Sequence, residues 1–304
     1  MNKSFNKKNK IFAINKNHLL CLLPLVLFSF YKNGLLVYKN HFLSLFSILQ
    51  YMVVPVIVVV LSYVFEIYYY VGRKKEKDLS KVINSFVPFA NLLCYLVTGP
   101  NNPLYITIPL IIVIDVLFKF IDNSFTINRI ALFKCLLFFI LVLLGIYNNY
   151  NYNELYGLGN NVNLSNLSVG FRIGEIGTIS NLLVLISFVL LLFNKFYKKY
   201  IALSGIITYS LLTLFFVLLK VITFNDALVF MLDSSVLFVM VFVLTLSDAS
   251  PVLKGGRILY GVLVGILCAI FVNVFKFYIG IYFVILGLSI ITPIINKLKI
   301  SLYK

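Results

Sequence analysis

Residues 42–71 read FLSLFSILQYMVVPVIVVVLSYVFEIYYYV and contain a single ionisable carboxylate, Glu66. A transmembrane helix needs about 20 mostly apolar residues, so this stretch is long enough to cross a bilayer. The rest of the 304-residue chain is similar: 61% of the residues are apolar, 12% are charged and the mean hydropathy is +1.00. Soluble domains are roughly half apolar and a quarter charged. The composition excludes a soluble enzyme and a disordered chain, and it predicts an all-α polytopic membrane protein.

The same length criterion finds ten candidate transmembrane spans along the chain. They cover residues 17–31, 42–71, 82–97, 103–120, 130–148, 179–196, 201–222, 227–246, 257–275 and 278–295. The first and third are short, as tilted or partly re-entrant helices are. We predict about ten transmembrane helices.

The net charge of +16 comes from 26 Lys and Arg against 10 Asp and Glu. In a soluble protein such an excess points to nucleic acid, but in a polytopic membrane protein basic residues gather on cytoplasmic loops. With the N-terminus inside, 21 of the 26 fall on the cytoplasmic side, and those left outside are Lys32, Lys39, Arg172, Lys220 and Lys276. This predicts cytoplasmic N- and C-termini in the plasma membrane of a prokaryote, and no nucleic-acid partner.

One long polar stretch, rich in Asn, Tyr and Gly, divides the chain. We predict a basic cytoplasmic tail at 1–16, a first membrane half at 17–148, an extracytoplasmic loop at 149–178 and a second membrane half at 179–304. Five spans per half is an odd number, which is typical of an inverted-topology repeat with its site near the interface of the halves.

Ionisable residues inside spans persist only when they are paired or face a polar pathway. Asp115 has Lys119 four residues on, so the two either form a structural ion pair or mark an ion pathway. Asp233 is followed by two serines, and together these oxygen-bearing side chains would suit a partly dehydrated cation. Alternatively, Asp233 lies close to the membrane interface. Glu66 is expected to be an interfacial anchor. The four cysteines are isolated and lack a nearby His, so no metal site is expected.

Residues 247–265, SDASPVLKGGRILYGVLVG, form the most specific feature of the chain. Pro251 ends a helix, and the pair Gly255 and Gly256 frees the backbone to approach another group closely. Gly261 and Gly265 are spaced for close helix packing. The loop is either an ordinary cytoplasmic turn or part of a cavity or ligand site.

This stretch resembles the TDPV…KGR signature of the integral subunit shared by the Rnf electron-transport complex (RnfD) and the sodium-translocating NADH:quinone reductase (NqrB). Asp248 and the later Lys-Gly-Arg residues match. A second segment, residues 170–180, is similar to the family's G-x-I-P-G-S-I-G-E-T-S, with Thr178 in place of the glutamate. The resemblance implies a flavin or ion site that includes Ser247, Asp248, Ser250, Lys254, Gly256, Arg257, Gly170, Gly174, Gly177 and Thr178.

The departures from the family pattern concern the cofactor. The family attaches flavin mononucleotide to a threonine in an SGAT-like segment, and residues 148–177 contain no threonine. We therefore expect no covalent flavin, and a non-covalent FMN or riboflavin at most. Of the family's GGLGQNxFNPA segment only Asn128 is kept.

Two functions follow. The first is a divergent RnfD/NqrB-like subunit of a flavin-based, ion-coupled electron-transport system, with other membrane subunits, the lipid bilayer, and quinone or Na⁺/H⁺ as partners. Such a subunit is non-catalytic or carries electrons, because no side chain here can transfer a hydride. The alternative is a small-molecule or ion transporter or channel on a related fold without redox chemistry. Polytopic glycan enzymes are a third and weaker reading.

Overall fold

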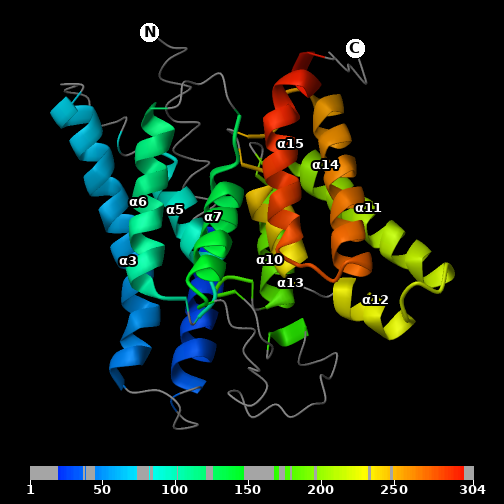
Figure 1. Cartoon of the computed structure of the whole chain (residues 1–304), viewed down its shortest axis with the longest axis horizontal. Helices are drawn as coiled ribbons and strands as arrows, with labels where there is room; N and C mark the ends of the chain where they lie inside the picture. Colours follow the sequence, from blue (N-terminus) through cyan, green and yellow to red (C-terminus); the bar gives the residue numbers. More distant parts are fainter. Residues whose placement is uncertain are drawn as a thin grey trace.

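The computed structural model describes the chain in thirteen segments. They are residues 20–36, 38, 45–73, 82, 85–100, 102–120, 126–146, 168–170, 175–178, 180–194, 197–231, 234–246 and 249–297. All regular secondary structure in these segments is helical, as predicted (Figure 1). The predicted outer loop, 149–178, lies mostly outside them, and so do residues 1–16, so the predicted division of the chain stays a prediction.

A helical segment lies in each of the ten predicted ranges. Their bounds are Leu20–Leu35 with η1 (Phe30–Leu36), α3 (Leu45–Ile67) with η2 (Tyr68–Arg73), α5 (Val87–Leu96), α6 (Leu104–Phe120), α7 (Arg129–Leu143), α10 (Asn181–Leu192), α11 (Lys199–Leu218), α12 (Phe224–Met231) with α13 (Ser234–Phe238) and η3 (Val239–Val243), α14 (Lys254–Ala269) with η4 (Ile270–Val274), and α15 (Gly280–Lys297).

Among the described residues, five helices are long and apolar enough to cross a membrane by length and composition. They are Gln50–Arg73, Lys199–Leu218, Phe224–Val243, Lys254–Val274 and Gly280–Lys297. The first and third ranges hold shorter helices, as predicted. The sixth, expected over 179–196, is also short: α10 begins after Ser180, whose hydroxyl accepts a hydrogen bond from the Leu183 amide (3.3 Å), and ends at Leu192. The count of ten transmembrane helices remains a prediction.

Basic residues mark one end of the helical bundle. α3 with η2, α6 and α15 end at the top of Figure 1, where α14 begins. These ends carry Arg73, Lys119, Lys254 and Lys297. By the positive-inside rule this is the end expected in the cytoplasm.

α11 and α14 cross closely and run parallel. A Cβ on Gly261 would lie 2.5 Å from the Ile201 carbonyl oxygen and would also meet Ser204 Oγ, and a Cβ on Gly265 would lie 2.8 Å from the Gly205 carbonyl oxygen. The backbones can approach this closely only because these positions lack side chains. The close packing predicted from Gly261 and Gly265 is confirmed.

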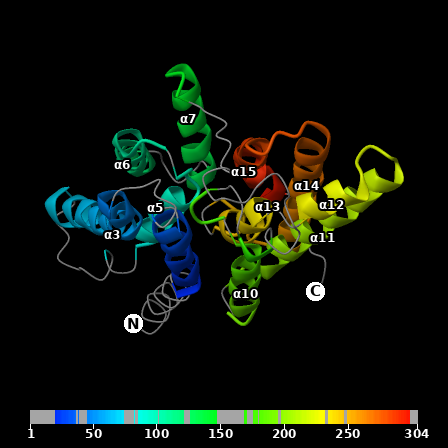
Figure 2. The ribbon, with the colours of Figure 1, turned by 90° about the horizontal axis from the view of Figure 1, so that it is seen from below.

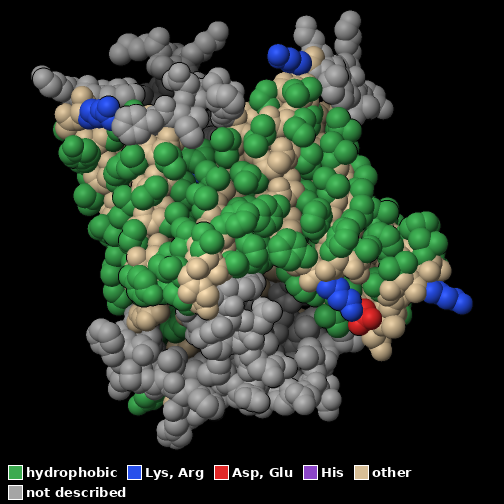
Figure 3. Space-filling view, viewed as in Figure 1, with side chains coloured by type: hydrophobic (Ala, Val, Ile, Leu, Met, Phe, Trp, Pro, Cys, Tyr) green, Lys and Arg blue, Asp and Glu red, His purple; other side chains and the backbone are tan. Residues whose placement is uncertain are grey.

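Two helices lie in the middle of the molecule and are buried on all sides. All ten residues of α5 are buried, and every residue from Val236 to Leu246, covering most of α13 and all of η3, is buried too. Figure 2 shows α5 and α13 surrounded by the other helices. The outer helices carry exposed apolar side chains over a broad face (Figure 3), as a bilayer environment requires. A fully buried helix gives the fold a place where polar groups can lie away from lipid.

Candidate functional site

The predicted site residues do not lie together in the structure. Four lie outside the described part of the chain: Ser247, Asp248, Asp233 and Gly174. The described residues of the loop after η3 lie beside α15, and Asp115 lies next to α5. Thr178 and Gly177 lie against the C-terminal end of α5.

The loop after η3 is held by hydrogen bonds to its surroundings. Ser250 Oγ donates to the Leu246 carbonyl (2.6 Å) and accepts from Lys198 Nζ (2.5 Å). Further along, Thr292 Oγ1 donates to the Ala249 carbonyl and Asn296 Oδ1 accepts from the Val252 amide, both at 3.1 Å. These contacts fix the loop against the end of α15.

Gly256 does not leave an open space in the described part of this loop. A Cβ on Gly256 would lie 3.3 Å from both Ile295 Cγ2 and Pro251 Cβ, so the missing side chain allows packing within the chain rather than the approach of a ligand. Arg257 Nε donates to the Pro251 carbonyl (3.2 Å), and Lys254 Nζ lies 5.8 Å from the Tyr200 ring centroid.

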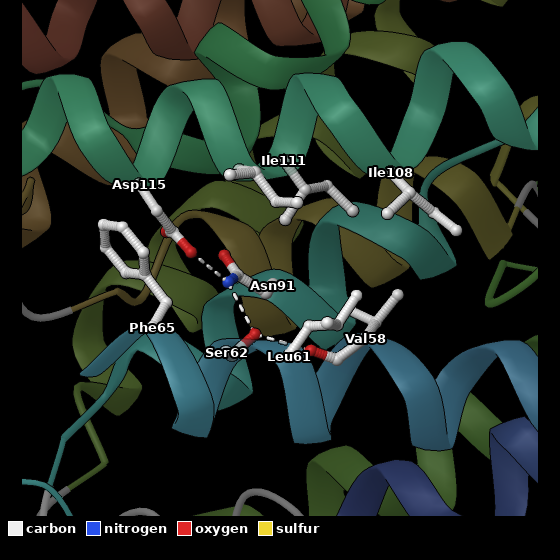
Figure 4. Close-up of a pocket in the computed structure, with 9 residues that line it drawn as sticks. Val58, Leu61, Ser62, Phe65, Asn91, Ile108, Ile111 and Asp115 are labelled. Carbon is white, nitrogen blue, oxygen red and sulfur yellow. Dashed lines mark hydrogen bonds between the residues drawn. The ribbon is translucent and has the colours of Figure 1, made fainter. Parts of the chain in front are cut away.

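Asp115 is the centre of a buried polar network at the start of α5 (Figure 4). Its carboxylate accepts from Arg129 Nη1 (2.9 Å) and from Asn91 Nδ2 (2.5 Å), and Asn91 Nδ2 also donates to Ser62 Oγ (2.7 Å). The four residues come from α6, α7, α5 and α3. Neither Asn91 nor Arg129 was predicted, because no sequence signal brings positions 24 and 14 residues from Asp115 to its carboxylate.

The expected pairing of Asp115 with Lys119 is replaced by two separate ion pairs. Lys119 Nζ lies 2.6 Å from Glu66 Oε1, and it also lies 4.5 Å from the Tyr69 ring centroid. Glu66 was expected to be an interfacial anchor, but it is fully buried. The ion pairs differ from the predicted ones because of the tertiary structure. α3 brings a second carboxylate to the side of α6 that carries Lys119, while α7 brings Arg129 to Asp115.

Two small cavities adjoin the network. The first is drawn in Figure 4, has a volume of about 10 Å³ and is lined by Ser62, Asn91, Asp115 and apolar side chains. That volume matches about one water molecule. The second, of about 20 Å³, is lined by Phe86, Ala90, Phe118, Ile127, Arg129, Leu246 and Ala249. It lies between the start of α5 and the loop after η3, which belong to the two predicted halves.

A second polar group lies at the other end of α5. Lys134 Nζ lies 2.6 Å from Glu175 Oε1 and donates to the Val97 carbonyl (2.6 Å). The Tyr282 hydroxyl donates to Glu175 Oε2 (2.7 Å). Lys134 had been assigned to the cytoplasmic side, but the structure buries it within α7. Glu175 lies in the segment 170–180, which resembles a family motif and was predicted to contribute to a site. Glu175 itself was not among the predicted site residues.

The 175–178 segment closes the end of α5 by backbone hydrogen bonds. The Ile176 amide donates to the Thr98 carbonyl (2.8 Å) and the Gly177 amide to the Leu96 carbonyl (2.6 Å). A Cβ on Gly177 would meet Leu96 Cβ at 2.6 Å, so only glycine permits this approach. Thr178 is fully buried, and Gly170 has a positive φ of 113°.

Asn128 joins the two predicted halves. Its Oδ1 accepts from the Ala131 amide (3.1 Å) and caps α7, while its Nδ2 donates to the Val243 carbonyl at the end of η3 (2.9 Å). The backbone amide of Asn128 donates to Ser289 Oγ of α15 (3.1 Å). Asn128, the one residue kept from the family segment, therefore links the two predicted halves by hydrogen bonds.

Comparison with known families places this architecture among the integral membrane subunits of Rnf- and Nqr-type complexes. The model of the NQR2, RnfD, RnfE family matches residues 3–302, nearly the whole chain, and the chain belongs to that family. A search of curated proteins finds no match. The predicted family is confirmed, and with it a multi-pass integral membrane protein whose relatives assemble with other membrane subunits.

Proposed function

We propose that this chain is a divergent subunit of a flavin-based, ion-coupled electron-transport system in the plasma membrane of a prokaryote, and that it provides the scaffold and part of the ion pathway. One observation carries the proposal. The central helix α5 is buried along its whole length, and ion pairs lie at both of its ends. Charges inside a membrane protein are costly and usually mark an ion or substrate pathway.

Buried helices in corresponding positions of the two predicted halves support a site between two repeats. α5 is the third helical segment of the first predicted half, and α13 with η3 belongs to the third segment of the second half. Both are buried, and the binding sites of inverted-repeat transporters lie near the interface of the two repeats. We infer five-plus-five topology with both termini in the cytoplasm.

Asp115 is our candidate for the cytoplasmic end of the pathway. Asn91 and Ser62 hold polar atoms beside its carboxylate, and the small cavity there has space for about one water molecule. Arg129 links this network to the second cavity, which reaches the loop containing Ala249. A coupling ion or proton would therefore enter between the two halves. Asp233 is retained as a second candidate in the part of the chain that the structure does not describe.

Electron transfer requires a cofactor, because no side chain of this sequence carries a hydride or an electron reversibly. We propose that any flavin of this chain is held non-covalently, and that the loop around Asp248 faces the partner subunits or quinone. Basic side chains at its end of the bundle, such as Lys254 and Lys198, suit contact with acidic groups of a partner.

The test is purification of the tagged chain from its native membrane in mild detergent. We expect co-purifying subunits with flavin or iron–sulfur centres, and loss of Na⁺- or H⁺-coupled quinone reduction in membranes that lack the chain. A chain that purifies alone and conducts ions in proteoliposomes without any electron donor would contradict the electron-transport function and support the transporter or channel alternative.

A further inference from the structure

Lys134 occupies a position with the features of a cation site. Its ammonium has two oxygen neighbours at 2.6 Å, the Glu175 carboxylate and the Val97 carbonyl, and lies 5.7 Å from the centroid of the Tyr282 ring. Carboxylate and carbonyl oxygens together with an aromatic face are the groups that bind partly dehydrated monovalent cations in membrane proteins.

The end of α5 contributes to this environment. The last carbonyls of a helix lack partners within the helix and carry the negative end of its dipole. At α5 the Leu96 and Thr98 carbonyls are taken by backbone amides of the 175–178 segment, while the Val97 carbonyl is left for the ammonium. Helix ends exposed by an interrupted span bind coupling ions in secondary transporters in the same way.

We propose that Glu175, the Val97 carbonyl and the Tyr282 ring form a binding site for one monovalent cation, which the Lys134 ammonium fills in this structure and which a free cation such as Na⁺ takes when the ammonium withdraws. The inference rests on the ion-coupled function proposed above and adds the opposite end of the pathway from Asp115. The exchange breaks no covalent bond, since the side chain leaves with its proton.

Charge explains why the occupant is monovalent. Glu175 supplies one negative charge, and an ammonium or a single alkali cation neutralises it, whereas a divalent cation would leave an excess positive charge in a low-dielectric site. The described chain does not fully enclose the pair: the side chains of Lys134 and Glu175 are 10% and 17% exposed.

The first test uses the full chain with Lys134→Ala. The truncation removes the resident charge and leaves Glu175 and the Val97 carbonyl for a free ion. At constant ionic strength, we expect the thermal unfolding midpoint of Lys134→Ala in detergent to rise by several degrees when NaCl replaces choline chloride, and to rise far less in wild type. In Lys134→Ala/Glu175→Gln the dependence on Na⁺ should vanish. Equal midpoints of Lys134→Ala in the two salts would show that the pair only fastens the 175–178 segment to the bundle.

The second test keeps Lys134 and works even if the truncated chain does not accumulate. The sequence contains no tryptophan, so Tyr282→Trp places a single indole next to the ammonium. We expect its emission to shift with NaCl but not with choline chloride, and the shift to disappear when Glu175→Gln is added. An emission indifferent to NaCl would overturn the exchange. A chain that co-purifies with redox subunits yet shows no response to Na⁺ would reject this site and leave the proposed function standing.

Discussion

Asp115 and Glu66 are 2% and 0% exposed, yet each lies beside a cation. A buried ion pair is weak evidence of stability, because the loss of hydration offsets much of the attraction. Breaking such a pair is different, since the remaining charge stays buried without compensation. The Asp115 network, with its amide and hydroxyl partners, is therefore expected to be sensitive to a single change of charge.

We expect Asp115→Asn to lower the free energy of unfolding by about 3–5 kcal/mol, because Arg129, whose side chain is only 14% exposed, then loses its carboxylate partner. Adding Arg129→Gln should restore part of that loss. Thermal unfolding in detergent of the two single variants and the double variant measures the coupling between the residues. Asp226→Asn, on an exposed carboxylate of α12, serves as the control and should cost far less. Additive losses in the double variant would show that the two charges act independently.

Asp248 is the residue for which the family signature makes the strongest claim. We expect Asp248→Asn to abolish electron transfer or transport while the protein stays at its normal level in the membrane, because the amide removes the charge and keeps the shape of the side chain. Arg257→Gln is the comparison, and it should lower abundance by removing the bond to the Pro251 carbonyl. Quantitative immunoblots and activity of isolated membranes check both. Normal activity in Asp248→Asn would remove the site from this loop.

At the scale of elements, close backbone contact joins α11 to α14 and a wholly buried surface surrounds α5. Gly261 and Gly265 allow the close contact between α11 and α14, because they have no side chains that would keep the two backbones apart. In lipid there is little hydrophobic driving force between helices, so packing of this kind contributes much of the association. The α11–α14 pair is therefore expected to be rigid.

Gly261→Ala should destabilise the fold by about 1–3 kcal/mol, because a Cβ there overlaps the Ile201 carbonyl and Ser204. Gly287→Ala in α15 is a matched control. Nothing lies within 4 Å of the position of its Cβ, so the substitution should stabilise the chain by about 0.5–1 kcal/mol through helix propensity. Unfolding midpoints of both variants in one detergent provide the measurement. A neutral Gly261→Ala would mean that the two helices can separate at little cost.

For the whole molecule, the distribution of charge decides orientation. The ends of α3 with η2, α6 and α15 and the start of α14 share one side and carry basic residues. Lys220 and Lys276 follow the opposite ends of α11 and η4, in agreement with their predicted place outside.

Reporter fusions should place residues 72–81, 197–200 and 248–256 in the cytoplasm and residues 150–170 outside, because basic residues are retained on the inner side. Alkaline phosphatase and green fluorescent protein fusions at these positions give complementary signals. Finding residues 150–170 in the cytoplasm would remove the ten-span topology.

The purified protein should carry no covalent flavin. Residues 148–177 lack an acceptor threonine, and the hydroxyl-bearing residue that follows, Thr178, is fully buried. Fluorescence of the denatured band in a gel detects a flavin that survives unfolding. A fluorescent band with a flavin peptide that maps to Ser165 or Ser168 would show that serine replaces the threonine.

The sequence alone predicted the family, the all-helical membrane class and the places of the helical segments. These properties depend on local composition: a run of apolar residues partitions into a bilayer whatever its neighbours are. The contact between Gly261 and α11 was also accessible, because the spacing of small residues on one helix signals close packing.

The partners of the buried charges were decided only by the tertiary structure. Sequence spacing put Lys119 next to Asp115, but α3 offered Glu66 to that lysine and α7 brought Arg129 to the aspartate. Lys134 looked like a cytoplasmic charge until the 175–178 segment, 41 residues further along, brought Glu175 against it. A buried charge is stable only beside a partner. Which residue becomes that partner depends on how the helices pack around α5, and no local sequence pattern encodes that packing.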